Sequence, residues 1–228
     1  MRGNVAISIL GLFSLSLSLI GCNNISQERK IEFVYLALGA SDTTGVGATP
    51  VTEGYVYLVN RDLQQRISGT FLINFGVPGA RIDSLIEQVR LAKHVRSKAK
   101  LATVWTGAND LVHGDDPSRF QSDLRELLRT LQSQVSKTVV IANIPNLTQL
   151  PVFRATPNPA VTLERIKVFN HAIEVEAAYV NASIVDVFAQ PVQDDLVFDG
   201  DGFHPNETGH RLVEDLFLKV ILERLGLG

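Results

Sequence analysis

The feature that most constrains this chain is a regular alternation of short apolar runs with longer segments of helical periodicity. Five runs have the length and the Val, Ile, Leu and Phe content of buried parallel strands; they cover residues 32–38, 70–74, 101–106, 138–142 and 183–186. Four segments place apolar residues at helical spacing; they cover residues 81–95, 120–135, 161–181 and 208–225. Strands that alternate with helices predict right-handed crossovers, and therefore a parallel sheet with helices on both faces.

The length and charge of the chain narrow the classes of protein to which it can belong. Its 228 residues have the composition of an ordinary globular protein, with 45% hydrophobic and 20% charged residues. This length fits one domain with an additional segment. The net charge of −3 gives no basic surface for a phosphate backbone, so we expect no nucleic-acid partner. We expect the domain to span residues 31–228 and to be a monomer.

The N-terminal residues have the pattern of an export signal. Arg2 supplies a positive start, and residues 5–20 form an uncharged apolar run that ends before Gly21 and Cys22, the single cysteine of the chain. The run is shorter than the roughly 20 apolar residues of a membrane-spanning helix and has no positive flank on its far side. A permanent anchor helix is the alternative interpretation.

Residues 19–22, Leu-Ile-Gly-Cys, resemble the bacterial lipobox. This resemblance implies that residues 1–21 are a lipoprotein signal peptide and that Cys22 carries lipid, which gives the protein a membrane partner. Residues 22–30 are polar and lack periodicity, as expected of a lipidated tether. We therefore expect a protein anchored in the bacterial cell envelope, with its domain outside the cytoplasm. A coincidental cysteine behind an ordinary cleavage site is the alternative.

Unusual residues follow four of the five predicted strands, where the loops at the carboxyl ends of a parallel sheet collect ligands. Ser41 follows the first strand, Gly79 the second and Asn109 the third, while Asp201 and His204 lie between the last strand and the final helix. Each of these residues alone is common in turns or at helix caps. The combination is what indicates a site.

These side chains have the chemistry of a hydrolytic site. A serine hydroxyl needs an imidazole to accept its proton, and the imidazole needs a carboxylate on its other nitrogen. Ser41, His204 and Asp201 fit these roles, since a separation of three residues lets Asp201 reach Nδ1 while Nε2 faces Ser41. The backbone N–H groups of Ser41 and Gly79 and the side-chain amide of Asn109 are placed to stabilise an oxyanion.

Two other segments resemble ligand-binding motifs but lack residues that those motifs require. The segment that begins at Asp199 starts like a calcium loop, but its sixth residue is His204 in place of glycine and its twelfth is His210 in place of glutamate. Residues 45–47, Gly-Val-Gly, lack the third glycine of a dinucleotide fingerprint and the Gly-Lys of a phosphate loop. We expect no metal and no cofactor.

Four blocks of this chain resemble those of the SGNH hydrolases, also called GDSL esterases/lipases. They are residues 38–41 (Leu-Gly-Ala-Ser), 74–79 (Asn-Phe-Gly-Val-Pro-Gly), 107–110 (Gly-Ala-Asn-Asp) and 201–204 (Asp-Gly-Phe-His). The resemblance implies the family's flavodoxin-like fold, a doubly wound five-stranded parallel sheet in three α/β/α layers.

The same resemblance implies an activity. Ser41 would be the nucleophile of an ester hydrolase that acts through an acyl-enzyme, with Asp201 and His204 completing the triad. Ser41, Gly79 and Asn109 would form the oxyanion hole. The implied substrate is a small-molecule, lipid or carbohydrate ester, and the family needs no metal or cofactor.

The first block departs from the family pattern. The family usually reads Gly-Asp-Ser, whereas this chain has Ala40 before the serine and Asp42 after it. This departure supports an alternative, a non-catalytic or weakly active envelope binding lipoprotein of the same fold. The loops 46–54, 113–118 and 147–159 are the candidates for specificity. The apolar residues of the last loop would suit an acyl chain or would simply pack; they are Leu147, Leu150, Val152 and Phe153.

Overall fold

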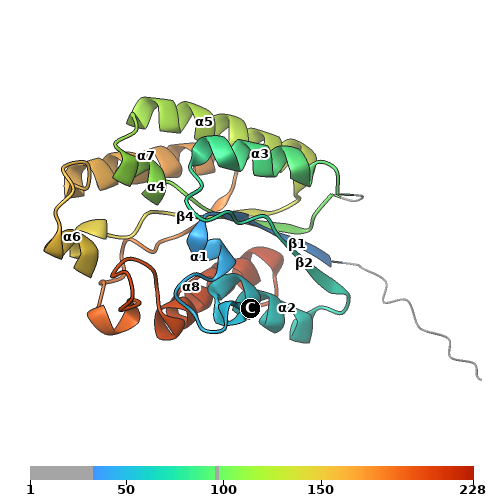
Figure 1. Cartoon of the computed structure of the whole chain (residues 1–228). Helices are drawn as coiled ribbons and strands as arrows, with labels where there is room; N and C mark the ends of the chain where they lie inside the picture. The colour runs from blue at the N-terminus through green and yellow to red at the C-terminus, as the bar shows by residue number, and fades with distance from the viewer. Residues whose placement is uncertain (1–32, 96–97) are drawn as a thin grey trace, which may run out of the picture.

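The computed structural model describes residues 33–95 and 98–228. In that part of the chain a five-stranded sheet lies between two layers of helices (Figure 1). Its strands are β1 (Phe33–Gly39), β2 (Thr70–Asn74), β3 (Leu101–Trp105), β4 (Val139–Ala142) and β5 (Ser183–Val185). All pairings are parallel, in the order β2-β1-β3-β4-β5. The predicted three-layer, doubly wound sheet is confirmed, and each predicted strand agrees to within one residue at either end.

The helices divide between the two faces of the sheet (Figure 1). One layer consists of α3 (Ile82–Ala92), α5 (Pro117–Thr130) and α7 (Leu163–Tyr179). The other consists of α2 (Tyr55–Arg66) and α8 (Glu207–Leu225). The four predicted helices are present, with the segment 120–135 ending in a π-helical turn, Leu131–Val135. The prediction did not include α2, which makes the first crossover.

Short helices occupy the loops at the carboxyl ends of the strands. They are α1 (Ser41–Thr44), α4 (Ala108–His113), α6 (Pro151–Ala155) and the 3-10 turns Val51–Glu53, Leu147–Gln149 and Asp194–Leu196. The segment 147–159, which we expected to be a loop, therefore contains a 3-10 turn and α6. Pro151 stands at the first position of α6, where its missing N–H costs nothing.

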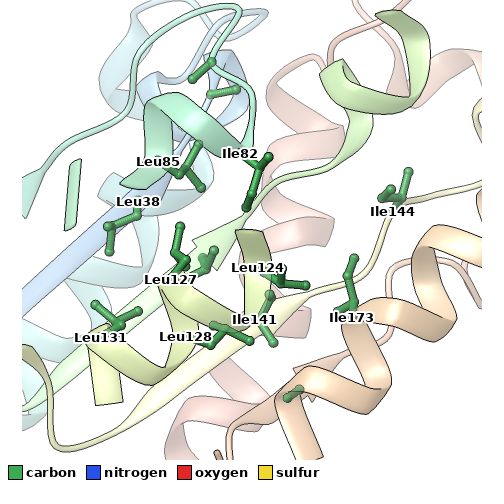
Figure 2. Packing of buried hydrophobic residues seen from close by; sticks show 14 of the residues in the cluster. Leu38, Ile82, Leu85, Leu124, Leu127, Leu128, Leu131, Ile141, Ile144 and Ile173 are labelled. Atoms are coloured by element: carbon green, nitrogen blue, oxygen red, sulfur yellow. The ribbon is translucent and has the colours of Figure 1, made fainter. Parts of the chain in front are cut away.

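Alternation along β1 explains why the sheet is covered on both sides. Leu36 and Leu38 pack into the cluster formed with α3, α5 and α7, whereas Tyr35 and Ala37 pack into the cluster formed with α2 and α8. Figure 2 shows the first cluster, in which Leu38 lies near side chains of α3 and α5. Both faces of β1 are apolar because both are buried.

The strand order reverses at β1, and this places the site. The chain passes from β1 outward to β2 and then returns across β1 to β3. The loops after β1 and β3 therefore leave neighbouring strands, which pair as far as Gly39 and Trp105. A crevice at such a reversal is where ligands bind in open α/β sheets.

The expected signal peptide (1–21), the tether (22–30) and lipidated Cys22 lie outside the described residues. No helix within 33–95 or 98–228 combines the length and the apolar character needed to cross a membrane.

Candidate active site

Ser41 is the first residue of α1, directly beyond the end of β1. Two residues earlier, a Cβ on Gly39 would lie 2.1 Å from Thr43 Oγ1 and 2.7 Å from the carbonyl oxygen of Trp105. Glycine is therefore needed for this close approach. The buried side chain of Gln88, from α3, accepts a hydrogen bond from Gly39 N–H and donates one to its carbonyl, both at 3.0 Å. These contacts fix the strand end that presents Ser41.

The structure brings Ser41, His204 and Asp201 together in one hydrogen-bonded row. His204 Nε2 lies 2.7 Å from Ser41 Oγ, and His204 Nδ1 lies 2.6 Å from Asp201 Oδ2. The Ser41 side chain and the histidine ring reach each other across 163 positions of the sequence. Ser41 is buried, whereas Asp201 keeps about a third of its side-chain area exposed, at 34%.

The carboxylate of Asp201 is held by several donors. Its Oδ1 accepts hydrogen bonds from the backbone N–H groups of Phe203 (2.8 Å) and His204 (3.0 Å). Partial burial opposes ionisation of this carboxyl, but the hydrogen bonds from His204 and Phe203 outweigh it, so the pKa of Asp201 lies below its ordinary value. An ionised Asp201 orients His204 with Nδ1–H toward the carboxylate, which leaves Nε2 free to accept a proton.

Aromatic side chains support the histidine from a separate element. The rings of Phe203 and His204 meet edge to face at 4.9 Å, and Phe153 of α6 meets Phe203 at 5.9 Å in the same geometry. The backbone N–H of Val152 donates to the carbonyl of Gly202 at 3.1 Å. The helix α6 therefore packs against the loop that carries His204.

Gly79 and Asn109 lie in the loops after β2 and β3. Gly79 has φ +77°, a left-handed conformation that favours glycine, and its face is open to solvent. Asn109 Nδ2 donates to the carbonyl of Ala80 at 2.9 Å, which ties the two loops together. A carboxamide nitrogen carries two protons, so the second proton of Asn109 remains for another acceptor.

Asp110 adds a second tie between the same loops. Its Oδ1 accepts a hydrogen bond from the backbone N–H of Ile82 at 2.9 Å. The side chain is fully buried, and burial raises the pKa of Asp110 to about 6 against the opposing effect of that bond. Arg81, between the two loops, pairs with Asp115 at 3.0 Å, and the exposed His113 joins this pair.

His210 was not recognised from the sequence as part of the site. It is fully buried in α8, accepts a hydrogen bond from Tyr55 N–H at Nδ1 (3.3 Å) and donates from Nε2 to the carbonyl of Val46 (2.9 Å). This pattern requires a neutral ring, and burial lowers the pKa of His210. His210 therefore holds the segment after Ser41 against α8. No spacing of residues in the sequence indicates this contact.

A cavity of about 110 Å³ lies beside the triad and is mostly apolar. Its walls include Ala40 and Asp42, which flank Ser41, as well as Phe203 and Pro205, which flank His204. Apolar side chains from several elements complete it, among them Trp105, Leu147, Leu150, Val187 and Leu212. Asn109 reaches the same cavity. Of the apolar rim expected after β4, Leu147 and Leu150 form part of the wall, while Val152 and Phe153 pack against the core.

Within the described ranges, no group of three or more His, Cys, Asp or Glu side chains is placed to hold a metal ion. The geometry is that of a serine hydroxyl, an imidazole and a carboxylate in one hydrogen-bonded row, beside two loops tied to each other by hydrogen bonds.

The GDSL-like lipase/acylhydrolase family matches this chain over residues 37–212. The chain belongs to this family. The match takes in the end of β1, the other four strands and all of the site residues described above, from Gly39 to His210. No curated protein matches the chain in sequence.

Solved structures of bacterial proteins share the fold of this chain. The esterase EstA from a Pseudoalteromonas species is 21% identical, with a TM-score of 0.68 over 86% of this chain and 100% of that chain. A lipase/acylhydrolase from Enterococcus faecalis is 23% identical, with a TM-score of 0.68 over 85% of this chain and 97% of that one. A lipolytic protein of the G-D-S-L family from Veillonella parvula is 20% identical, with a TM-score of 0.63 over 83% and 98%.

Proposed function

We propose that this protein is a serine-dependent carboxylic ester hydrolase that works through an acyl-enzyme at Ser41. The observation that carries this proposal is the unbroken row of hydrogen bonds from Asp201 through His204 to Ser41, with distances of 2.6 Å and 2.7 Å. Membership of the GDSL-like lipase/acylhydrolase family supports acyl hydrolysis in general.

In the first half-reaction, Ser41 Oγ attacks the carbonyl carbon of the ester while its proton passes to His204 Nε2. Asp201 stabilises the resulting imidazolium through Nδ1. The tetrahedral intermediate collapses when its bond to the alcohol oxygen breaks and His204 returns the proton to that oxygen. The alcohol leaves, and the acyl group remains on Ser41.

In the second half-reaction, water attacks the acyl-serine while His204 Nε2 accepts its proton. The intermediate breaks its bond to Ser41 Oγ, which recovers the proton from His204. The carboxylic acid leaves, and the site returns to its starting state. Neither step consumes any group besides the ester and water.

The developing oxyanion would be held by the N–H groups of Ser41 and Gly79 and by the free proton of Asn109 Nδ2. Each such donor contributes about 10²–10³ in rate in comparable sites. The bonds from Asn109 and Asp110 to the Gly79 loop fix the relative position of these donors before substrate arrives. Such preorganisation is what makes an oxyanion hole effective.

The alternative of a non-catalytic binding protein rested on Ala40. The bidentate contact of Gln88 with Gly39 holds the serine segment without a carboxylate at position 40. These bonds support the enzyme over the binding-protein alternative, because they restrain the segment before Ser41 despite the departure from the family's first block.

Turnover is the direct test. The purified chain should release p-nitrophenol from a short-chain p-nitrophenyl ester with an initial burst, and a fluorophosphonate probe should label Ser41. The Ser41→Ala variant should show neither. If the wild-type chain hydrolyses no short-chain ester and takes up no label at Ser41, the binding-protein alternative replaces the enzyme.

We further propose that Cys22 carries lipid and holds the domain at the bacterial cell envelope. The support is the lipobox-like segment 19–22 and the polar residues that follow it. Cells grown with labelled palmitate should yield a labelled protein in the membrane fraction. Cys22→Ala should abolish the label and release the domain from that fraction; retention of label in this variant would exclude the assignment.

A further inference from the structure

The end of the sheet opposite the candidate active site is basic. In the described residues, the connections that lead from helices into β2, β3, β4 and β5 contain four lysines and no aspartate or glutamate. The lysines are Lys93, Lys98, Lys100 and Lys137. Because all strands are parallel, these connections meet at the amino ends of the strands, whereas the site lies at the carboxyl ends.

Three of these lysines lie beside the start of β1. The backbone N–H of Lys100 donates to the carbonyl of Val34 at 3.0 Å, and that of Lys137 donates to the carbonyl of Ala99 at 2.9 Å. Lys98 directly precedes Ala99. The three lysines therefore share the end of the sheet at which the chain enters β1.

The charges of the four lysines are not neutralised by neighbouring carboxylates. All four are solvent-accessible, and within the described ranges none of them forms an ion pair. Arginines near the active site do form such pairs, as Arg81 does with Asp115 and Arg154 with Asp194. The basic end of the sheet thus keeps its positive charge for an outside partner.

The active-site end of the sheet has the opposite charge. The connections from each strand to the long helix that follows contain ten Asp and Glu residues and only two Arg. They cover residues 40–54, 75–81, 106–116, 143–162 and 186–206. Figure 1 shows α4 and α6, which belong to these connections, at one end of the sheet and the start of β1 at the other. The seven residues of β1 separate the two ends by about 20 Å, at roughly 3.3 Å per residue.

Exposed apolar side chains also lie at the basic end. Phe71 is 47% exposed and pairs with Val34 in the sheet, and Tyr179, the last residue of α7, is 67% exposed. Leu91, near the end of α3, and Leu227, after α8, are exposed as well. Aromatic rings together with lysines are the side chains that favour a membrane interface.

The lipid proposed on Cys22 is joined to this same end. Ten residues separate Cys22 from Phe33, where β1 begins, and a fully extended chain of that length spans at most about 40 Å. This length allows more than one orientation of the domain at a membrane. The charges select among them, because a bilayer of anionic phospholipids attracts the basic end and repels the acidic one.

We propose that Lys93, Lys98, Lys100 and Lys137 hold the basic end of the domain on the anionic phospholipid surface of the membrane, so that the crevice at Ser41 opens away from it. This inference rests on the proposed lipidation of Cys22 and the proposed ester hydrolysis at Ser41. Esters then reach the site from the aqueous side, and the phospholipids of the anchoring bilayer do not.

The orientation can be measured with the lipidated full chain in vesicles rich in phosphatidylglycerol. Lipid blocks Cys22, the single cysteine, so a newly introduced cysteine takes one dye. Ser68→Cys labels the basic end and Thr156→Cys the active-site end, both at exposed positions. With an acceptor dye on the lipid headgroups, we expect more energy transfer from position 68 than from position 156. Phosphatidylcholine vesicles or high salt should reduce this difference.

Lys100→Gln combined with Lys137→Gln should weaken the preferred orientation by about 25-fold, from about fivefold for each lysine at an anionic surface. Arg119→Gln combined with Lys167→Gln is the matched control. It removes the same charge from exposed positions in the first third of α5 and of α7, at the active-site end of these helices. The control should not reduce the difference in energy transfer, and both double variants should hydrolyse p-nitrophenyl butyrate at the wild-type rate.

Three results would overturn the inference and leave the hydrolase intact. They are equal or greater energy transfer from position 156, a difference that the Lys100 and Lys137 substitutions leave unchanged, and release of fatty acid from the vesicle phospholipid as fast as p-nitrophenyl butyrate is cleaved. Absence of lipid on Cys22 removes the anchor and the inference with it. A chain that takes the expected orientation but hydrolyses no ester would contradict the proposed hydrolysis alone.

Discussion

The side-chain amide of Gln88 hydrogen-bonds both backbone groups of Gly39, the residue two positions before Ser41. This relationship crosses from the helix layer into the end of the central strand. It makes the position of Ser41 depend on a glutamine 47 residues further along the chain, and a first prediction tests that dependence.

Gln88→Leu should lower both the stability and the activity of the enzyme. The change leaves Gly39 N–H buried without its acceptor, which costs about 1–3 kcal/mol of the free energy of unfolding. Urea denaturation measures this loss, and kcat on a p-nitrophenyl ester measures the displacement of Ser41. Gln64→Leu is the control, since Gln64 is exposed and has one weak bond, of 3.5 Å. An unchanged kcat in Gln88→Leu would mean that Gln88 contributes to stability but does not position Ser41.

Asp201→Asn should reduce kcat by about 10³- to 10⁴-fold with a small effect on stability. An asparagine can present its NH₂ to His204 Nδ1, which favours the tautomer with the proton on Nε2 and removes the base. Steady-state kinetics at neutral pH give the comparison. Asp194→Asn alters an exposed carboxylate that pairs with Arg154, and it should retain wild-type kcat. A loss below about tenfold in Asp201→Asn would contradict the triad.

Two glycines offer a matched test of the oxyanion hole. Gly79 (φ +77°) and Gly226 (φ +69°) both have left-handed backbones, and a Cβ on either meets nothing within 4 Å. Alanine at each position should cost about 1 kcal/mol of stability through backbone strain. Only Gly79→Ala should also lower kcat, because in the proposed mechanism it shifts an N–H that stabilises the oxyanion. Equal kcat in the two variants would remove Gly79 from the oxyanion hole.

The buried His210 predicts a loss of stability in mild acid. Its pKa is lowered from an ordinary value of 6.5 by burial, so the unfolded chain binds a proton at a higher pH than the folded one. The stabilisation from neutral His210 is complete above about pH 6.5 and is lost as the pH falls through the folded pKa. Urea denaturation at about pH 7.5 and pH 5 should show wild type losing more stability than His210→Gln. A constant difference between the two would contradict this assignment.

The strands were predictable because they are buried on both faces. In β4 (Val139–Ala142) every residue is apolar and buried, so the ends of the strand coincide with the ends of an uninterrupted apolar run. The helix α2 escaped prediction because its first five residues are aromatic or aliphatic, as in a strand, and its second half is polar. Its buried residues do lie at helical spacing: Tyr55, Val56, Val59 and Leu63. The helical period of these residues is present in the sequence. Only their packing against the sheet shows that the segment is a helix and not a strand.

The residues of the candidate site also fall into two groups, those that the sequence indicates and those that only the structure shows. Ser41, Gly79, Asn109, Asp201 and His204 are detectable because each lies in a short block at the end of a strand or before a helix. Gln88 and His210 are not detectable, since each acts through a partner at least 49 positions away and sits within an ordinary helical pattern.

Part of the cavity wall comes from stretches of the chain that are remote in sequence from Ser41 and His204. Residues 190–193 after β5 and Leu147 and Leu150 after β4 shape the space, while Ser41 and His204 stand on α1 and on the loop before α8. Under the proposed function, substitutions in these wall residues would change which ester fits the cavity and leave the Ser41–His204–Asp201 row unaltered. The shape of this part of the cavity can thus vary independently of the hydrogen-bonded row.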